Sequence, residues 1–285
     1  MAAAAVGLLT LAGVHAIAVR GDSFPARTQA LSGAPVELRV QSGVGAREVR
    51  AIADGVRRSH RFIRSALGRT VRGPVVARIA RADTCPGADG DRSVIGQGGA
   101  GELCLDTANV EWQWLIRNHP EEATSLPAHE YVHVLQAQLG CLPTGDDRDF
   151  RWIVEGMASH IGWEALVWSG RVDAADVAAT IRRDGAFDPE VGPLRQYERR
   201  GGRTPQYAQW HLAVRHLLDA AVSAGFASPA RPEAALIRFC ERVGAGRTWR
   251  GAFLASFGLS VFDFYARFEE AVWGRRGSQA ALTLP

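Results

Sequence analysis

Residues 129–133 read HEYVH, and residues 152–158 read WIVEGMA. A helix turns every 3.6 residues, so His129 and His133 lie one above the other on the same helical face, where their imidazoles can share one metal ion. Glu155, on a returning segment, supplies a third protein ligand and leaves one tetrahedral position open. The pattern predicts a catalytic zinc site, with one Zn²⁺ per chain.

Glu130 follows the first histidine directly. It is too far around the helix to be a ligand, but close enough to take a proton from a water molecule activated by the metal. Its neighbours Tyr131, Val132, Val134 and Leu135 are apolar, so much of this helix is expected to be buried. Burying two histidines and a carboxylate side by side is costly unless they bind a metal or pair with one another. A helix with merely solvated histidines is therefore disfavoured.

The third ligand depends on the turn-rich stretch GCLPTGDD, residues 140–147, which ends the first helix and reverses the chain. A second helix is expected from Asp149, a suitable N-cap, and it carries Glu155 among apolar residues. Gly156 has no side chain and therefore allows a neighbouring helix to come close. The competing third ligand is His160, more than one turn beyond Glu155.

HExxH followed by a glutamate in the context WIxEGxA resembles the gluzincin metallopeptidases, the thermolysin- and aminopeptidase-N-like enzymes grouped as peptidase MA. The resemblance covers about residues 95–225. It implies that the two histidines and Glu155 bind zinc and that Glu130 is the general base. Where thermolysin has an aspartate that orients a zinc-bound histidine, this chain has Ser159 followed by His160. Both are candidates for orienting a metal ligand.

A gluzincin also stabilises the reaction's oxyanion with a tyrosine or histidine from a later helix. Here Tyr207 opens the segment YAQWH, which resembles the corresponding segment of the family, and it is the first choice for this donor. His211, one turn later, is the alternative and a further candidate for contact with the metal ligands. An equally weighted alternative interpretation is that Tyr207 is a core aromatic residue whose hydroxyl needs only a hydrogen-bond partner.

Upstream of the metal helix, residues 94–106 read VIGQGGAGELCLD, a glycine-rich approach to a short strand. In this enzyme class an edge strand before the metal helix pairs with the extended substrate, and glycines let another backbone come close. The substrate-binding candidates are therefore Gly99, Ala100, Gly101 and Glu102. The segment weakly resembles the GxMEN element of aminopeptidases, whose glutamate captures the substrate amine. The competing interpretation is a hairpin with its glutamate in solvent.

The N-terminal segment is uncharged and apolar from Ala2 to Val19 apart from one histidine, with a small-residue cleavage site at residues 16–18. Residues 1–18 are therefore expected to be a secretory signal peptide, or an uncleaved anchor because the segment lacks a basic start. No other stretch is long and apolar enough to cross a membrane. We expect a secreted or extracytoplasmic protein without stable membrane insertion, unless this segment is retained.

Four cysteines in an exported chain predict two disulfides, with three possible pairings. Cys85 and Cys104 flank a loop rich in glycine and aspartate, which a bridge would close locally. Cys141 ends the metal helix and Cys240 lies in a late helix, so a second bridge would tie the metal helix to the C-terminal helices. We predict these two pairs. Cysteine as a zinc ligand is disfavoured because no CxxC spacing occurs.

The 33 basic residues are all arginine and face 30 acidic residues, for a net charge of +3. Such a composition, rich also in alanine, glycine and valine, is typical of a GC-rich bacterial genome. The arginine clusters do not interleave with aromatic residues, so no nucleic-acid partner is predicted and solvated faces are the default. The expected partner is a peptide or protein substrate.

The hydrophobic periodicity predicts an α+β protein, in which a small sheet lobe with a helix precedes a mainly helical, zincin-like lobe. Residues 19–285 are expected to form a single metallopeptidase-like domain, with 19–108 as the sheet lobe and 109–285 as the helical lobe. Strands are expected at 36–40, 74–79 and 101–105, with a helix at 46–67. Further helices are expected at 109–117, 121–139, 149–168, 173–183, 206–224, 231–243, 247–256 and 260–273. Pro127 either begins the metal helix or kinks a longer one.

Three functions are compatible with these patterns. The first is a secreted zinc endopeptidase acting on extended polypeptide. The second is an aminopeptidase, which needs an amine-binding carboxylate such as Glu102. The third is a non-enzymatic exported protein that keeps the fold, and Glu130 disfavours it because a structural zinc site gains nothing from a general base.

Overall fold

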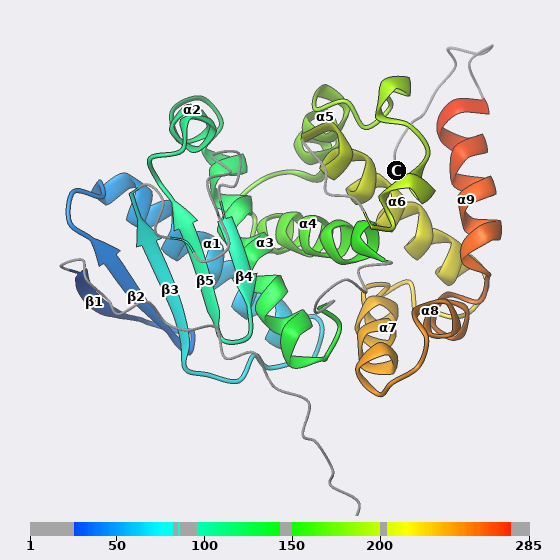
Figure 1. Ribbon diagram of the computed structural model, residues 1–285, viewed down its shortest axis with the longest axis horizontal. Coiled ribbons are helices and arrows are strands. Elements are labelled where there is room, and N and C mark those ends of the chain that lie inside the picture. The colour runs from blue at the N-terminus through cyan, green and yellow to red at the C-terminus, as the bar shows by residue number, and fades with distance from the viewer. Residues whose placement is uncertain (1–25, 82–84, 86–95, 143–149, 200–203, 275–285) are drawn as a thin grey trace, which may run out of the picture.

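The computed structural model describes residues 26–81, 85, 96–142, 150–199 and 204–274. Its class is α+β, as expected, with the strands near the N-terminus and helices through the rest of the chain. Figure 1 shows the sheet on one side of the molecule, the later helices on the other side, and two long helices between them.

The described strands form one sheet of five, in the order β1-β2-β3-β5-β4. They are β1 (Ala26–Leu31), β2 (Val36–Gln41), β3 (Val75–Ala80), β4 (Gly96–Gly99) and β5 (Glu102–Asp106). β2, β3 and β5 are parallel, whereas the edge strands β1 and β4 are antiparallel to their neighbours. The three predicted strands are confirmed within one residue at each end. β1 and β4 were not predicted.

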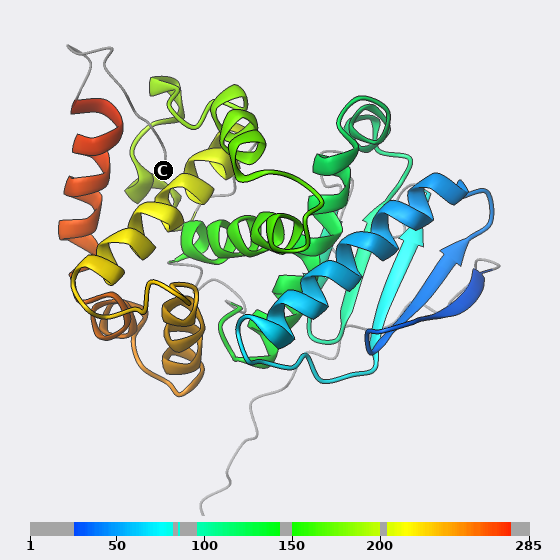
Figure 2. The ribbon, with the colours of Figure 1, turned by 180° about the vertical axis from the view of Figure 1, so that it is seen from behind.

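Alternation along the strands gives the sheet an apolar face and a polar face. Leu38, Ile79 and Leu103 belong to a hydrophobic core that continues into the helices. On the opposite face, Arg39 pairs with Glu37 and Arg78 with Glu102. Among the described residues, helices therefore cover only the first face. There α1 (Ala46–Ser65) connects the parallel strands β2 and β3, and it crosses in front of the sheet in the view of Figure 2.

Helix α1 packs along α3 (Pro120–Gln138), the helix that carries HEYVH. The contact is partly polar, because His60 Nδ1 lies 2.9 Å from the Tyr131 hydroxyl in a buried position. Tyr131 stands between the two histidines of the motif, so this bond helps to fix the rotation of α3 about its axis. Pro127 lies inside α3, which begins instead at Pro120. Of the two roles considered for Pro127, a place inside a longer helix is the one observed.

Helix α4 (Arg151–Trp168) carries Glu155 and packs against both α3 and α6 (Thr204–Ser223). Its N-cap is Phe150 and not Asp149, which lies outside the described residues. Gly156 makes the predicted close approach, and its partner is α6. A Cβ at this position would lie 2.6 Å from the Trp210 carbonyl oxygen.

The remaining helices complete the second side of the molecule. All eight helices predicted after residue 108 are present, with ends shifted by three residues or fewer when the π-helical turn η3 (Glu270–Gly274) is counted with α9. Besides α3, α4 and α6, these helices are α2 (Val110–Asn118), α5 (Ala174–Arg183), α7 (Ala234–Gly244), α8 (Trp249–Phe257) and α9 (Val261–Glu269). Two short 3-10 helices, η1 (Pro189–Val191) and η2 (Leu194–Tyr197), precede α6. Their aromatic side chains pack around Trp152, which stacks on Phe264.

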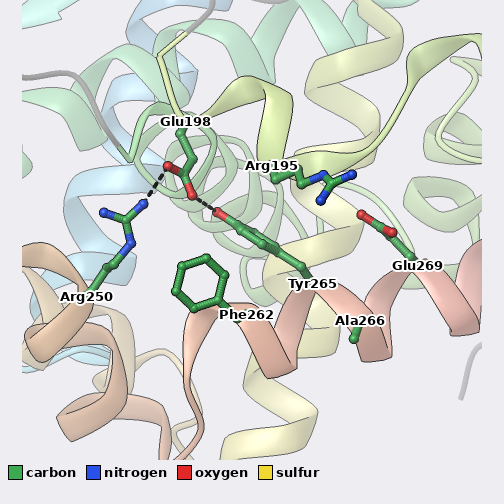
Figure 3. Close-up of a pocket in the computed structure, with 7 residues that line it drawn as sticks. All are labelled: Arg195, Glu198, Arg250, Phe262, Tyr265, Ala266 and Glu269. Atoms are coloured by element: carbon green, nitrogen blue, oxygen red, sulfur yellow. Dashed lines mark hydrogen bonds and ion pairs between the residues drawn. The ribbon is translucent and has the colours of Figure 1, made fainter.

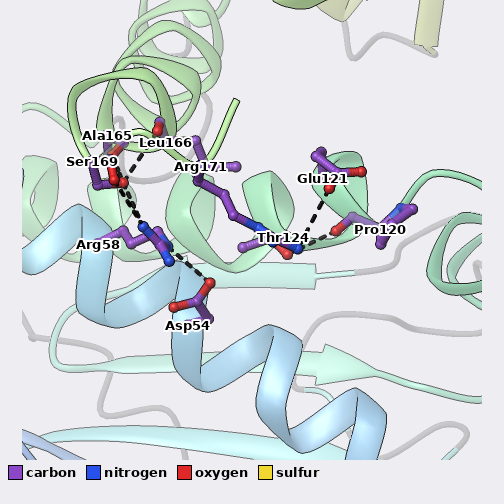
Figure 4. Close-up of polar contacts among 9 residues, drawn as sticks. All are labelled: Asp54, Arg58, Pro120, Glu121, Thr124, Ala165, Leu166, Ser169 and Arg171. Carbon is purple, nitrogen blue, oxygen red and sulfur yellow. Dashed lines mark hydrogen bonds and ion pairs between the residues drawn. The ribbon is translucent and has the colours of Figure 1, made fainter. Parts of the chain in front are cut away.

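A polar seam joins α1 and α3 to the end of α4 (Figure 4). Arg58 forms a 2.8 Å ion pair with Asp54 and donates to Ser169 Oγ at 2.8 Å. Arg171 pairs with Glu121 at 3.5 Å. Ser169 is the C-cap of α4, where a cation interacts favourably with the helix dipole. The seam thus holds the end of α4 against the helices that cover the sheet.

Both predicted disulfides are confirmed: Cys85 is joined to Cys104 and Cys141 to Cys240. Persistent disulfides are typical of extracytoplasmic proteins. Among the described helices, none has the length and apolar character required to cross a bilayer.

Candidate metal centre

Three side chains from two helices converge on one point between α3 and α4. The Nε2 atoms of His129 and His133 lie 3.0 Å apart, and Oε2 of Glu155 lies 3.3 Å from each of them. All three side chains are largely buried. The helix brings the histidines together by its i, i+4 spacing, and the packing of α4 on α3 adds the carboxylate. Glu155, and not the competing His160, is therefore the third member.

The spacing of these atoms fits a metal ion. Tetrahedral geometry with metal–ligand distances of about 2.0–2.1 Å separates ligand atoms by about 3.3–3.4 Å. The three observed distances, 3.0, 3.3 and 3.3 Å, are close to this value. Two imidazoles and a carboxylate that face one another in a buried place are stabilised by a metal ion or a shared proton between them. His129, His133 and Glu155 thus form a group that could hold a metal ion, and we call these three residues the metal group.

The electrostatics of the group also favour positive charge. Burial by itself lowers the pKa of His133, but the carboxylates of Glu155 and Glu130 outweigh it and raise this pKa to about 9. Burial likewise opposes ionisation of Glu155, yet the two histidines hold its pKa well below the usual range. The carboxylates therefore stabilise a proton, or another cation, at the imidazole nitrogens.

Both histidines are oriented by a second hydrogen bond. His133 Nδ1 lies 2.6 Å from Oε1 of Gln136, whose Nε2 donates to the Val154 carbonyl at 2.9 Å. Because a carbonyl oxygen only accepts, Nδ1 of His133 carries the hydrogen, and in the neutral ring Nε2 keeps its lone pair for a metal. His129 Nδ1 lies 3.2 Å from Ser159 Oγ. Ser159 was one of the candidates for such a contact. Gln136 was overlooked, although its i, i+3 spacing from His133 places it on the same helical face.

Glu130 is enclosed by the edge strand β4. A Cβ at Gly96 would lie 2.8 Å from Glu130 Oε1, and one at Gly98 would lie 2.1 Å from the Glu130 carbonyl oxygen. Only glycine permits β4 to lie this close to α3. Burial raises the pKa of Glu130 against the opposing effect of the two histidines. The carboxylate is thus held beside the group of His129, His133 and Glu155 without belonging to it.

Tyr207 lies beside the metal group, and His211 does not. The rings of Tyr207 and His129 have centroids 6.0 Å apart. Burial, followed by the charge of Glu155, raises the Tyr207 pKa, so the hydroxyl stays protonated and can donate. Tyr207 also contacts the guanidinium of Arg151, which lies 3.6 Å from Glu155 Oε1. Arg151 was not singled out from the sequence.

His211 and His160 meet each other away from the metal group. Their ring centroids are 5.4 Å apart, and His160 Nε2 lies 3.4 Å from Glu233 Oε1. Burial, then the neighbouring His160 and Arg215, hold the pKa of His211 well below its usual value. The structure therefore brings only Ser159, of the three candidates, into contact with a metal-group histidine.

The predicted substrate-binding residues are divided between two strands. Gly99 ends β4, Ala100 and Gly101 form the turn, and Glu102 begins β5. The edge strand beside α3 is β4, and the predicted strand at 101–105 is internal. Glu102 pairs with Arg78 at 2.6 Å on the polar face of the sheet. It is therefore not brought to the metal group, because alternation along β5 turns it away from the helices.

A separate pocket of about 500 Å³ opens in the helical part of the molecule (Figure 3). Its wall is built around Glu198, whose carboxylate accepts hydrogen bonds from Arg250 and from the Tyr265 hydroxyl, each at 2.8 Å. The Tyr265 hydroxyl in turn accepts from Trp152 Nε1 at 3.0 Å. No metal-group residue lines this pocket, and its central polar groups satisfy one another.

Comparison with known proteins assigns no family, since neither a protein-family model nor a curated protein sequence matches this chain.

Gln136→Leu is expected to weaken metal binding about 10- to 100-fold, because His133 loses the acceptor that fixes its orientation. Competition with a chromophoric chelator measures the affinity. Gln138→Leu is the matched control, since Gln138 lies on the same helix but bonds the Arg72 backbone. Equal metal affinity in a folded Gln136→Leu variant and in this control would contradict the role of Gln136.

Proposed function

We propose that this protein is an exported, zinc-dependent peptidase of the gluzincin type that cleaves extended polypeptides. The observation that carries the proposal is the convergence of His129 Nε2, His133 Nε2 and Glu155 Oε2 at 3.0–3.3 Å, with Glu130 beside them on the same helix. Two imidazoles and one carboxylate form a donor set used by catalytic zinc in peptidases. The N-terminal apolar segment and the two disulfides support export.

Zinc held by these three residues would lower the pKa of a water molecule and polarise the scissile carbonyl. Glu130 accepts the proton of the attacking water and passes it to the leaving amine. Tyr207, protonated in its buried position, donates a hydrogen bond to the oxyanion of the tetrahedral intermediate. Arg151 positions the Tyr207 hydroxyl and neutralises part of the charge on Glu155.

The edge strand β4 supports an endopeptidase better than an aminopeptidase. It is the last strand of the described sheet and lies against Glu130, so a substrate strand added beside it would pass the metal group. Backbone pairing of this kind recognises extended polypeptide without needing a free terminus. An aminopeptidase needs a carboxylate that binds the substrate amine. Glu102 does not supply it, because it pairs with Arg78.

The test combines metal analysis with hydrolysis. Purified protein is expected to contain one zinc per chain and to cleave internally quenched and N-terminally blocked peptides from an unbiased library, with activity lost on chelation and restored by zinc. His133→Ala is expected to lose the metal. Zinc content unchanged in His133→Ala would reject the assigned ligands, and a zinc-loaded protein that cleaves no peptide would reject the peptidase function.

Tyr207→Phe is expected to lower kcat about 100- to 1000-fold while changing KM little, because the hydroxyl acts on charge that develops only in the transition state. Steady-state kinetics on one cleaved peptide measure both constants. Tyr197→Phe is the control, since this tyrosine donates to the Val191 carbonyl outside the metal group. A wild-type kcat in Tyr207→Phe would leave the tyrosine with a packing role only.

A further inference from the structure

Helix α1 concentrates positive charge on its outward face. Six of its twenty residues are arginine, in a chain with 33 basic residues among 285. At about 100° per residue, all six fall within an arc of about 120°, and they extend for about 26 Å along the helix. We call this set the arginine stripe: Arg47, Arg50, Arg57, Arg58, Arg61 and Arg64. Figure 2 shows α1 running along the outside of the molecule.

The stripe is not neutralised by the rest of the described chain. Asp54 is the one acidic residue of α1 within the arc, and it pairs with Arg58 (Figure 4). The other five arginines form no ion pair with any described residue. Four of them are exposed and Arg57 is half-buried. Burial, and then the charge of Arg64, lower the pKa of His60 on the same helix.

This arrangement opposes folding of the free protein. Like charges three or four residues apart repel one another along a helix, and only one acidic side chain interrupts the series. Alternating charges along a helix face are typical of a solvent-exposed helix with salt bridges, and this face lacks such alternation. The excess charge is stabilising only when an anionic surface lies against it.

An exposed aromatic side chain borders the stripe. Trp168, at the end of α4, is 50% exposed, and its ring lies 6.0 Å from that of Phe62 on α1. The next residue, Ser169, accepts the hydrogen bond from Arg58. Tryptophan prefers the region of the lipid headgroups, where its ring is half immersed and its N–H stays hydrated. Surfaces that bind single-stranded nucleic acid, in contrast, interleave aromatic residues with the basic ones for base stacking, and the stripe itself contains none.

We propose that the arginine stripe, with Trp168 at its border, docks this protein peripherally on a membrane surface of anionic phospholipid. Each arginine near such a surface adds to the attraction, and the attraction decays within a Debye length. The inference is independent of the peptidase proposal, because it uses the outer face of α1 and not the metal group.

The experiment measures co-sedimentation of the full chain with vesicles of phosphatidylcholine alone, or of two parts phosphatidylcholine and one part phosphatidylglycerol. Binding is expected only to the anionic vesicles at about 0.05 M salt and is expected to be lost at about 0.5 M. Equal binding to both kinds of vesicle would overturn the proposal, since an apolar segment would bind either.

Two triple variants locate the binding face. Arg50→Gln/Arg57→Gln/Arg61→Gln is expected to weaken binding about 100-fold, or about fivefold for each arginine. The control Arg27→Gln/Arg182→Gln/Arg267→Gln removes the same charge from exposed positions on β1, α5 and α9, and should weaken it less than about threefold. Equal weakening of vesicle binding in both variants would indicate a net-charge effect and would overturn the proposal that the arginine stripe is the binding face.

Fluorescence and competition complete the test. Brominated lipid is expected to quench part of the tryptophan emission in the wild type, and that part should be missing in Trp168→Phe. Undiminished quenching in Trp168→Phe would place another face on the membrane. A DNA duplex that displaces the protein from vesicles at lower concentration than anionic lipid would assign the stripe to nucleic acid instead.

Discussion

Glu130→Gln is expected to lower kcat about 100- to 10,000-fold while the protein keeps its metal, which is the range attributed to a positioned general base. The substitution preserves the size of the side chain and removes its basicity. Metal binding and turnover can be separated in this way because Glu130 lies beside the metal group of His129, His133 and Glu155 without belonging to it. Elemental analysis measures the metal content and single-turnover hydrolysis measures the turnover of the same preparation.

Glu121→Gln is the matched control on the same helix. Glu121 pairs with Arg171 in the polar seam, away from the metal group, so its loss is expected to leave turnover unchanged. Two outcomes would contradict the role of Glu130: substantial hydrolysis by a metal-loaded Glu130→Gln variant, or loss of the metal with the activity. The second would make Glu130 a ligand.

Removing the Cys141–Cys240 disulfide is expected to have the largest effect on stability. The two cysteines are 99 residues apart in sequence, and they join the end of α3 to α7. The chain-entropy model gives about 4–5 kcal/mol for a loop of this length. For a domain of this size the Cys141→Ala/Cys240→Ala variant should melt about 7–10 °C below the wild type. Calorimetry measures the difference.

The stability of this variant is compared with that of Cys85→Ala/Cys104→Ala. Cys85 and Cys104 are only 19 residues apart in sequence. The same model gives about 3 kcal/mol for this loop, so its loss should lower the melting temperature less. This bridge attaches the segment before β4 to β5, so its removal is expected to raise KM more than it affects folding. A larger loss of stability from the short bridge than from the long one would contradict the order.

Features that depend on neighbours in sequence were predictable. The metal-group histidines are four residues apart, so any helix through them brings them together, and the apolar periodicity around them is local. The same periodicity located all eight later helices. The disulfide pairing was also predicted, from cysteine positions relative to those helices and the intervening loop, although one of the two bridges joins residues 99 apart.

Features that depend on partners distant in sequence could not be predicted. β1 has little alternation and β4 is largely glycine, so each exists as a strand through pairing with β2 or β5. Which strand forms the edge is a property of the assembled sheet. For the same reason Glu102 was kept as a substrate-binding candidate beside a glutamate in solvent, whereas its partner is Arg78 on a neighbouring strand.

The sequence alone therefore determined the class of fold, the helices, and two histidines and a neighbouring carboxylate suited to a metal site, because helix geometry and burial act within a few residues. The tertiary structure decided what surrounds them. It chose Glu155 over His160, placed Tyr207 and not His211 beside His129, and laid β4 on Glu130. These outcomes arise from how α4, α6 and the sheet pack on α3, and packing is set by long-range contacts that no local pattern records.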